Sequence, residues 1–492
     1  MFERRDVWKL SEENPWHPII EWYARAVTAM QGRDLTDPTS LRYLAAIHGV
    51  NRRELPRRRW PRGATWNECQ HDSWFFLPWH RIYLHYFESV VRRTIADLGG
   101  PSDWALPYWD YSDPERENVR RLPPAFRERQ MPSGDPNPLF VSERAPGINQ
   151  GGELDPLFVD IDDAMAIRHF SRPTVDLDPD PANEFVSSGF GGPRSGWNHS
   201  EGALGRLEIT PHGQVHVGVG GIDPPGWMSL FETAGLDPIF YLHHANIDRL
   251  WEAWLGLGDG RKNPGVRWRS MWFKVGGGAY AVTLSVREVL DTTQPPLTYR
   301  YSNISVPAPI PAPVLAASPN PESRSAEEEP VPQDSFPEMV GASEDRLPLA
   351  ATPTEVEVAV EAPAGPALMA ESAEGARPRK VYLKVENVRG EKLAAPGYLV
   401  HVNLPPRADP TEYEDRRAGQ VTMFGVREAS EGDEEHSGSG LTFSFDITGV
   451  VQRLQETGEW DPDRLRVTFT PVGAGAAQGG DVSAGRVSLF YA

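Results

Sequence analysis

The protein has 492 residues, a formal net charge of −20 at pH 7 and a single cysteine, Cys69. This length is enough for more than one domain with a sizeable core, while the acidic excess argues against nucleic acid as a partner. One cysteine excludes intrachain disulfides and cysteine-rich zinc or iron–sulfur sites. The sequence has no apolar run of the roughly 20 residues that a membrane helix needs. Its first residues lack the basic and then apolar pattern of a secretory signal, so we expect a cytoplasmic protein that does not bind membranes.

Four segments of the first 301 residues are predicted to be helical. Apolar side chains recur at helical spacing in residues 18–30, 40–48, 78–98 and 238–251. Pro78 suits the first turn of the third helix, and Asp237 is a suitable N-cap for the fourth. We therefore predict a mainly α-helical bundle with long loops as a domain of residues 1–301.

Residues 302–378 differ in composition from the segments on either side. They are rich in proline, alanine and acidic side chains and contain few aromatic ones. Such a segment buries little surface and repels itself, so we predict an extended acidic linker. Within it, the alternating stretch 354–360 could add one strand to a neighbouring sheet.

Residues 379–492 alternate apolar and polar side chains in six runs, which predict strands at 380–386, 398–403, 420–426, 441–446, 465–470 and 486–491. A short helix is expected near residues 450–454. Several short strands in about 114 residues favour an antiparallel arrangement. We predict a small all-β antiparallel sandwich as the C-terminal domain.

Histidines that could bind metal cluster in the first domain. His212 and His216 are four residues apart, so one helix face could direct both imidazoles at one ion. A solvated or core-satisfied pair is the alternative, because this spacing also occurs by chance. His243 and His244 lie in a predicted helix, where Asp248 shares the face of His244 and could orient an outer donor.

A further set consists of His48, at a predicted helix end, with Cys69, His71 and His80. Together the histidines offer two sets of three neutral nitrogens. All-imidazole coordination disfavours calcium and structural zinc and suits copper, iron or catalytic zinc. The spacing alone does not choose the element.

These residues resemble a known family. His48, Cys69-x-His71, the run 77–81, the His212–His216 pair and the run 237–251 look like the paired copper signatures of tyrosinases, catechol oxidases and molluscan-type haemocyanins. Both signatures occur in the right order, and the resemblance covers residues 4–301. It implies a type-3 dicopper centre with two copper ions, whose ligands would be His48, His71 and His80 for the first ion and His212, His216 and His244 for the second.

The resemblance also assigns roles to residues around the ligands. His243, Asn246 and Asp248 would lie beside the second ion without binding it. Cys69 matches a position where some members carry a thioether bond to the imidazole, here that of His71. The alternative for Cys69 is a buried free thiol that packs as a small apolar residue.

Three further positions concern catalysis. Glu208 matches a carboxylate that holds a water near the second copper and could help to deprotonate a phenol. Its alternative is an exposed carboxylate near a helix N-terminus. Phe231 matches an aromatic gate over the first copper, and its alternative is core packing.

Residues 213 and 217 follow the first two ligands of the second copper. Members that hydroxylate monophenols strongly often carry asparagine at the first of these positions, whereas Gly213 offers no such hydrogen bond. Val217 adds an apolar wall without charge. With Phe231 as a gate, we expect diphenol oxidation to be stronger than monophenol hydroxylation.

The predicted function is that of a type-3 dicopper phenol oxidase, which uses dioxygen to oxidise small o-diphenols (catechols) to o-quinones. The alternatives are haemocyanin-like oxygen binding without turnover and o-aminophenol oxidation. The C-terminal domain loosely resembles the domain that covers the copper site in proenzymes of the family, which implies latency, although a role in assembly is the alternative. The sequence does not predict the oligomeric state.

Overall fold

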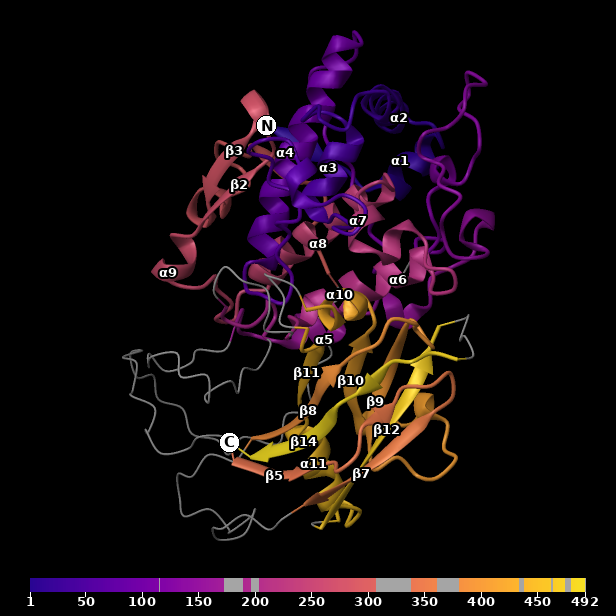
Figure 1. The fold of residues 1–492 in the computed structure, drawn as a ribbon, viewed down its shortest axis with the longest axis vertical. Helices are drawn as coiled ribbons and strands as arrows, with labels where there is room; N and C mark the ends of the chain where they lie inside the picture. The colour runs from indigo at the N-terminus through magenta and orange to yellow at the C-terminus, as the bar shows by residue number, and fades with distance from the viewer. Residues whose placement is uncertain are drawn as a thin grey trace.

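The computed structural model describes residues 1–491 apart from 115, 172–188, 196–202, 307–337, 361–379, 433–437, 462 and 474–478. A helical part and a β-rich part lie one above the other in Figure 1, with α10 of the second part at their junction. None of the helices in the described part of the chain is both long and apolar enough to cross a membrane.

The N-terminal domain is built from helices with few strands. Its helices are α1 (Val7–Glu13), α2 (Pro18–Gln31), α3 (Leu41–His48), α4 (Phe76–Asp97), α5 (Asp162–Ala166), α6 (Gln214–Gly220), α7 (Phe231–Ala234), α8 (Ile239–Gly256) and α9 (Val266–Arg269). A π-helical turn, Glu208–Gly213, precedes α6. The four predicted helices are confirmed as α2, α3, α4 and α8. The Ser40 side chain caps α3, and the Asp237 carboxylate accepts the Ile239 N–H at the start of α8.

Helix α4 lies at the centre of this domain and packs against α2 and α8. Aromatic side chains join α4 to α8, and the rings of Phe87 and Tyr241 stack with 3.4 Å between their centroids. Strands β1 (Phe2–Arg4) and β4 (Tyr299–Tyr301) pair in parallel, and β2 (Trp272–Val275) pairs with β3 (Val282–Ser285). The β1–β4 pair thus joins the two ends of the helical domain.

The C-terminal domain is an antiparallel β domain with two helices, α10 (Val426–Ser430) and α11 (Thr448–Glu456). Its strands are β5 (Glu338–Ala342), β6 (Leu347–Pro348), β7 (Thr354–Val360), β8 (Val381–Val388), β9 (Gly397–Val402), β10 (Arg417–Thr422), β11 (Leu441–Asp446), β12 (Arg464–Val472), β13 (Ser483–Ala484) and β14 (Arg486–Tyr491). Eight of them form one sheet in the order β10-β9-β12-β7-β5-β14-β8-β11.

The predicted fold class, a helical domain followed by an antiparallel β domain, is confirmed, but eight of the strands form one sheet instead of two facing ones, and β6 pairs with β13 apart from it. Edge strands β10 and β11 lie near each other, so the sheet curls almost into a barrel (Figure 1). Curling lets one sheet enclose an apolar core by itself.

The sheet also starts earlier in the chain than the sequence predicted. Strands β5 and β7 come from the segment 302–378 that we expected to be a linker, and β7 is the additional strand suggested by the alternation in 354–360. Strand β7 pairs with β12 on one side and β5 on the other. The backbone hydrogen bonds and apolar burial of these pairings outweigh the charge repulsion of its glutamates. Strand β6 also lies in this segment, and residues 307–337 and 361–378 of the predicted linker lie outside the described residues.

The end of β10 differs from prediction in a way that matters for the site. The expected strand over 420–426 stops at Thr422, and Gly425 adopts a left-handed conformation with φ of +82° before α10 begins. Glycine adopts this conformation without the steric cost that a side chain adds. The chain therefore turns at residues 423–425 and projects Phe424 toward the helical domain.

The two domains share buried apolar contacts. Leu204 and Ile209 of the helical domain are 5% and 0% exposed and belong to the core of the β domain. The Arg206 guanidinium lies 5.1 Å from the ring centroid of Phe445 on β11. Apolar burial of this kind is the main source of stability in protein interfaces, so the β domain is docked against the helical domain.

Candidate dinuclear metal site

Six histidines from distant parts of the chain converge in the helical domain. They come from the end of α3, the loop before α4, α4 itself, the π-helical turn, α6 and α8. Each is almost fully buried. They are the six ligands predicted from the sequence, and they fall into two groups: His48, His71 and His80, and His212, His216 and His244.

Each group is compact enough to hold one metal ion. Within each of the two clusters, the atoms that could ligate lie within 4.8 Å of one another. The clusters are also adjacent, because the rings of His80 and His244 stack in parallel with 4.5 Å between their centroids. The arrangement therefore suits two metal ions side by side at the centre of a helical bundle.

Backbone carbonyl groups orient four of the imidazoles. Nδ1 of His48 lies 2.9 Å from the Phe231 carbonyl oxygen, and Nδ1 of His216 lies 2.7 Å from that of Met228. His80 and His212 make the same contact with carbonyl oxygens four residues earlier in the chain. An imidazole that donates its Nδ1 proton to a carbonyl presents the Nε2 lone pair to a metal.

The buried imidazoles fit a metal better than they fit an empty core. Nε2 of His48 and of His212 is buried and has no hydrogen-bond partner among the described residues. Burial lowers the pKa of His48 to about 4 and the pKa of His212 well below its ordinary value. The rings are therefore neutral at pH 7, which is the form that binds metal.

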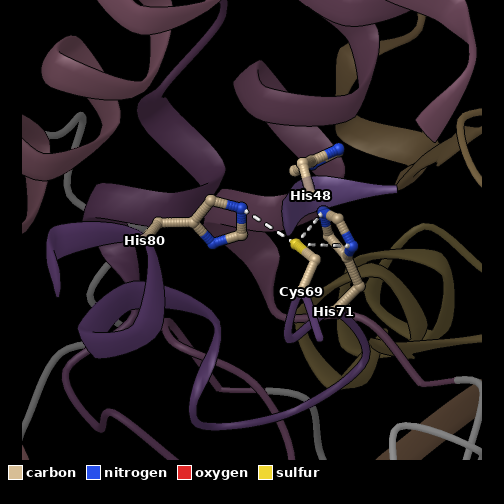
Figure 2. Close-up of side chains that lie close together, drawn as sticks. All are labelled: His48, Cys69, His71 and His80. Carbon is tan, nitrogen blue, oxygen red and sulfur yellow. Dashed lines mark hydrogen bonds between the residues drawn. The ribbon is translucent and has the colours of Figure 1, made fainter. Parts of the chain in front are cut away.

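Cys69 lies between the imidazoles of His71 and His80 in the first cluster (Figure 2). Its Sγ is 3.4 Å from His71 Nδ1, 3.8 Å from His71 Nε2 and 3.3 Å from His80 Nε2. Both nitrogens of His71 are within 4 Å of the sulfur. The sulfur therefore lies against the imidazole that the predicted thioether would join, and the bond itself stays a prediction.

Glu208 is buried beside the second cluster, so the alternative of an exposed carboxylate is wrong. It is 2% exposed, and its Oε1 accepts the Asp72 N–H at 3.0 Å. Burial is the main cause that raises the pKa of Glu208 well above its usual value, and the nearby Asp72 charge adds to it. The carboxylate is thus held by the segment that carries His71, and it lines the cavity next to His212.

Phe231 lies over the first cluster, as a gate would. Its ring stacks on His71 with 4.4 Å between centroids and lies 5.6 Å from that of His48. Gly213 is buried between the clusters and the β domain, and Val217 is 1% exposed on α6. Their predicted effects on activity stay predictions.

The residues predicted to lie beside the second ion have different neighbours. His243 contacts Tyr111, whose hydroxyl lies 3.0 Å from His243 Nδ1, and one ring nitrogen of His243 is close to the second cluster. The Asn246 amide oxygen accepts from Arg249. Asp248 was expected to orient an imidazole, but no contact of the described residues joins it to one.

Instead, Asp248 binds the elements that close the domain. Its carboxylate accepts hydrogen bonds from Arg81 on α4 and from Tyr299 and Tyr301 on β4. Arg4 on β1 lies 3.4 Å away. The i+4 spacing from His244 predicted the face of the helix, but the buried cations and hydroxyls of other elements compete successfully for this carboxylate.

Phe424 is a site residue that the sequence analysis missed. Its ring stacks on His216 with 4.1 Å between centroids and lies 4.8 Å from that of Phe231. It lines a cavity of about 530 Å³ together with His48, His71, His212 and Glu208. Gly425, which breaks the period-two pattern of the predicted strand, was the signal in the sequence for a turn at this point.

Two adjacent all-histidine sites in a helical bundle define a dinuclear metalloprotein, and comparison with known proteins gives its family. The common central domain of tyrosinase matches residues 38–257, and a domain of unknown function, DUF7868, matches residues 336–492. Tyrosinase HcTyr1 of Hahella sp. (strain CCB-MM4) is 34% identical over 99% of both chains. The chain therefore belongs to the tyrosinase family.

Another relative agrees with this assignment, and two solved structures share the fold. The chloroplastic polyphenol oxidase of Spinacia oleracea is 29% identical over 62% of this chain and 47% of its own length, so the chain spans about half of that relative. Latent aurone synthase, a polyphenol oxidase, shares the fold with a TM-score of 0.61 at 19% identity, covering 100% of this chain and 89% of its own. Latent apple tyrosinase has a TM-score of 0.60 at 21% identity, with coverages of 100% and 97%.

The family assignment identifies the metal. Tyrosinases and polyphenol oxidases are copper oxidases that act on phenols with dioxygen, and the two imidazole clusters provide sites for two copper ions. The donor set agrees, because neutral imidazole is a good ligand for copper and the sites contain no carboxylate ligand. The protein is thus an enzyme of the polyphenol oxidase type.

Proposed function

We propose that this protein oxidises catechols to o-quinones with dioxygen and that its C-terminal domain keeps it latent. The observation that carries the proposal is the position of Phe424, whose ring fills the space above His216 where a phenol would have to lie. Copper ions held by the six histidines supply the two-electron exchange between the phenol and dioxygen when they are bound.

Two residues near the metal clusters, Phe231 and Gly213, favour diphenols over monophenols. Phe231 stacks on His71 and narrows the approach to the first cluster. Gly213 offers no side chain to hydrogen-bond a water held by Glu208, so proton removal from a monophenol has less support. A catechol can bind through two adjacent oxygens and depends less on that help.

Latency is supported by the way the β domain covers the cavity. Besides Phe424, the lining of the cavity includes Thr422, Gly425 and Arg427 of the β domain. The Arg427 guanidinium pairs with Glu232, next to the gate residue Phe231, at 2.7 Å. A substrate of the size of a phenol therefore meets side chains of the second domain before it reaches the metal ligands.

A haemocyanin-like oxygen carrier is the second candidate, because a ring at the position of Phe424 would also exclude phenols from a carrier. The two functions differ once the β domain is removed. An enzyme then consumes oxygen continuously with 4-methylcatechol, whereas a carrier binds a stoichiometric amount and stops.

The test uses the copper-loaded full chain with a specific protease site introduced between residues 307 and 337, which precede all strands of the β domain. Oxygen uptake is measured with 4-methylcatechol and with tyrosol before cleavage and after separation of the domains in mild detergent. Copper content is measured in both states, and the unmodified chain treated with the same protease is the control. We expect a higher rate after separation with unchanged copper, and a higher rate with 4-methylcatechol than with tyrosol. An unchanged rate after separation contradicts latency, and faster turnover of tyrosol contradicts the substrate preference.

A further inference from the structure

Gly213 touches the β domain at a point where a side chain would not fit. A Cβ atom built on Gly213 would lie 2.7 Å from Oγ1 and 3.0 Å from Cγ2 of Thr422. It would also lie 3.2 Å from the Glu208 carbonyl oxygen. Real Cβ atoms essentially never approach other atoms within 3.0 Å, so any larger residue at 213 displaces Thr422.

The backbone does not explain why this residue is glycine. Gly213 has φ of −64° and ψ of −36°, a right-handed helical conformation that residues with a side chain adopt without strain. Alanine would even favour the helix that follows. The two closest obstacles to a side chain at 213 therefore come from the second domain.

Thr422 is poorly able to move aside because it is tied to Phe424. It is 1% exposed, and its Oγ1 accepts the Phe424 N–H at 3.2 Å. The hydroxyl thereby fixes the first part of the turn that directs Phe424 onto His216. A side chain at 213 that rotates or pushes Thr422 also disturbs the position of Phe424.

The residues on either side of Gly213 contact the same face of the β domain. Gln214 is fully buried, and its Nε2 donates toward the carbonyl oxygen of Val421 on β10 at 3.4 Å. Gly397 on β9 packs against Gln214, since a Cβ at Gly397 would lie 2.3 Å from Gln214 Nε2. Ile209 lies in the core of the β domain.

We propose that residues 209–214, the docking turn, form the surface on which the β domain docks. The absence of a side chain at Gly213 leaves the room that Thr422 needs for Phe424 to reach His216. This rests on the latency proposed above and adds the residue that decides it. The docking turn also carries His212 and leads into the helix of His216. The position expected to modulate the choice of phenol therefore also controls docking, so a change made there for substrate choice releases the β domain.

The test measures docking without substrate, by hydrogen–deuterium exchange of peptides covering residues 420–426 in the copper-loaded full chain. Overpacking by Gly213→Asn is expected to raise exchange of the Phe424 amide by about ten-fold, and Gly213→Ala by less. Thr422→Ala removes both colliding atoms, so Gly213→Ala combined with Thr422→Ala should match Thr422→Ala alone. Gly265→Asn is the control, because nothing lies within 4 Å of a Cβ at Gly265.

The two proposals fail in different ways. If exchange at 420–426 is the same in Gly213→Asn and Gly213→Ala as in the parent chain, the proposed role of Gly213 in docking is wrong, whatever the activity. If the effects of Gly213→Ala and Thr422→Ala on exchange simply add in the double variant, the contact between residues 213 and 422 is not the cause of the faster exchange in Gly213→Ala. If exchange rises as expected but separation of the domains leaves activity unchanged, the docking role of residues 209–214 is supported and latency is refuted. Copper content and thermal unfolding show whether the helical domain of each variant is folded. If Gly213→Asn does not fold, exchange in the milder variant Gly213→Ala tests the proposal.

Discussion

The ring of Phe424 stacks on His216 with 4.1 Å between centroids and 16° between planes, although the two residues belong to different domains. Phe424 is 5% exposed, so almost all of its surface is covered by the helical domain and the neighbouring turn. The β domain therefore inserts a side chain among the metal ligands, and displacement of the domain must expose that ring to water.

Phe424→Ala should activate the intact chain. Removing the ring opens the space over His216 while most contacts between the domains remain, so we expect oxygen uptake with 4-methylcatechol to rise by about ten-fold or more. Phe424→Leu, which still fills the space with apolar atoms, is the matched control and should stay near the parent rate. Equal rates for parent and alanine variant, at equal copper content, would show that Phe424 does not limit access.

Arg427→Ala should have a much smaller effect. Its ion pair with Glu232 is 2.7 Å long, but the Arg427 side chain is 34% exposed. Exposed pairs contribute about 0.2–1 kcal/mol, so the rate of the uncleaved chain should rise by less than about five-fold. Glu232→Gln should give the same result, and both effects should vanish in high salt. An increase as large as that of Phe424→Ala would mean that charge, and not apolar packing, holds the domains together.

The adjacent histidines of α8 should differ in copper binding. His244 stacks on His80 between the two clusters, whereas Nδ1 of His243 is engaged with the Tyr111 hydroxyl. We expect His244→Ala to bind fewer than two copper ions per chain and His243→Asn to bind two, measured by elemental analysis. The reverse pattern would exchange the roles of the two histidines.

The copper-free protein should lose stability in acid. Burial lowers the pKa of His48 from 6.5 to about 4 in the folded chain. Between these values the unfolded chain binds a proton that the folded chain does not, so the free energy of unfolding falls as the pH decreases from 6.5 toward 4. Urea unfolding across this range checks the slope, and His48→Leu, which lacks one such group, should give a shallower one. A slope that is the same in both proteins would mean that His48 does not contribute.

Cys69 should become linked to His71 in copper-loaded protein exposed to dioxygen. The thiol loses its hydrogen and Cε1 of His71 loses another as the carbon–sulfur bond forms, with dioxygen as the oxidant. Both residues lie in one tryptic peptide, 63–81, which should then weigh two hydrogens less than its sequence mass and resist thiol alkylation in mass spectrometry. Cys69→Ala gives the unlinked reference, and a peptide of full mass that is alkylated would leave Cys69 as a free buried thiol.

The metal ligands could be predicted from the sequence because the motifs that carry them resemble those of the tyrosinase family and because helical spacing is a local property. Imidazoles at i and i+4, such as His212 and His216, or at a capped helix end, such as His48, are placed by the helix that carries them. Asp248 shows the limit of this reasoning, because helical spacing gives the face of a side chain but not which distant cation or hydroxyl binds it.

From the sequence alone, periodicity predicted the helical and β domains, and the resemblance of its motifs to the tyrosinase family predicted the two imidazole clusters and the candidate catalytic residues. Periodicity and motif spacing are both properties of neighbouring residues. Only the tertiary structure decided that β5 joins the sheet between β7 and β14, and that Phe424 lies on His216. Strand pairing and domain docking join residues far apart in the chain. Their free energy comes from surfaces that exist only once both partners are folded, so no local pattern records it.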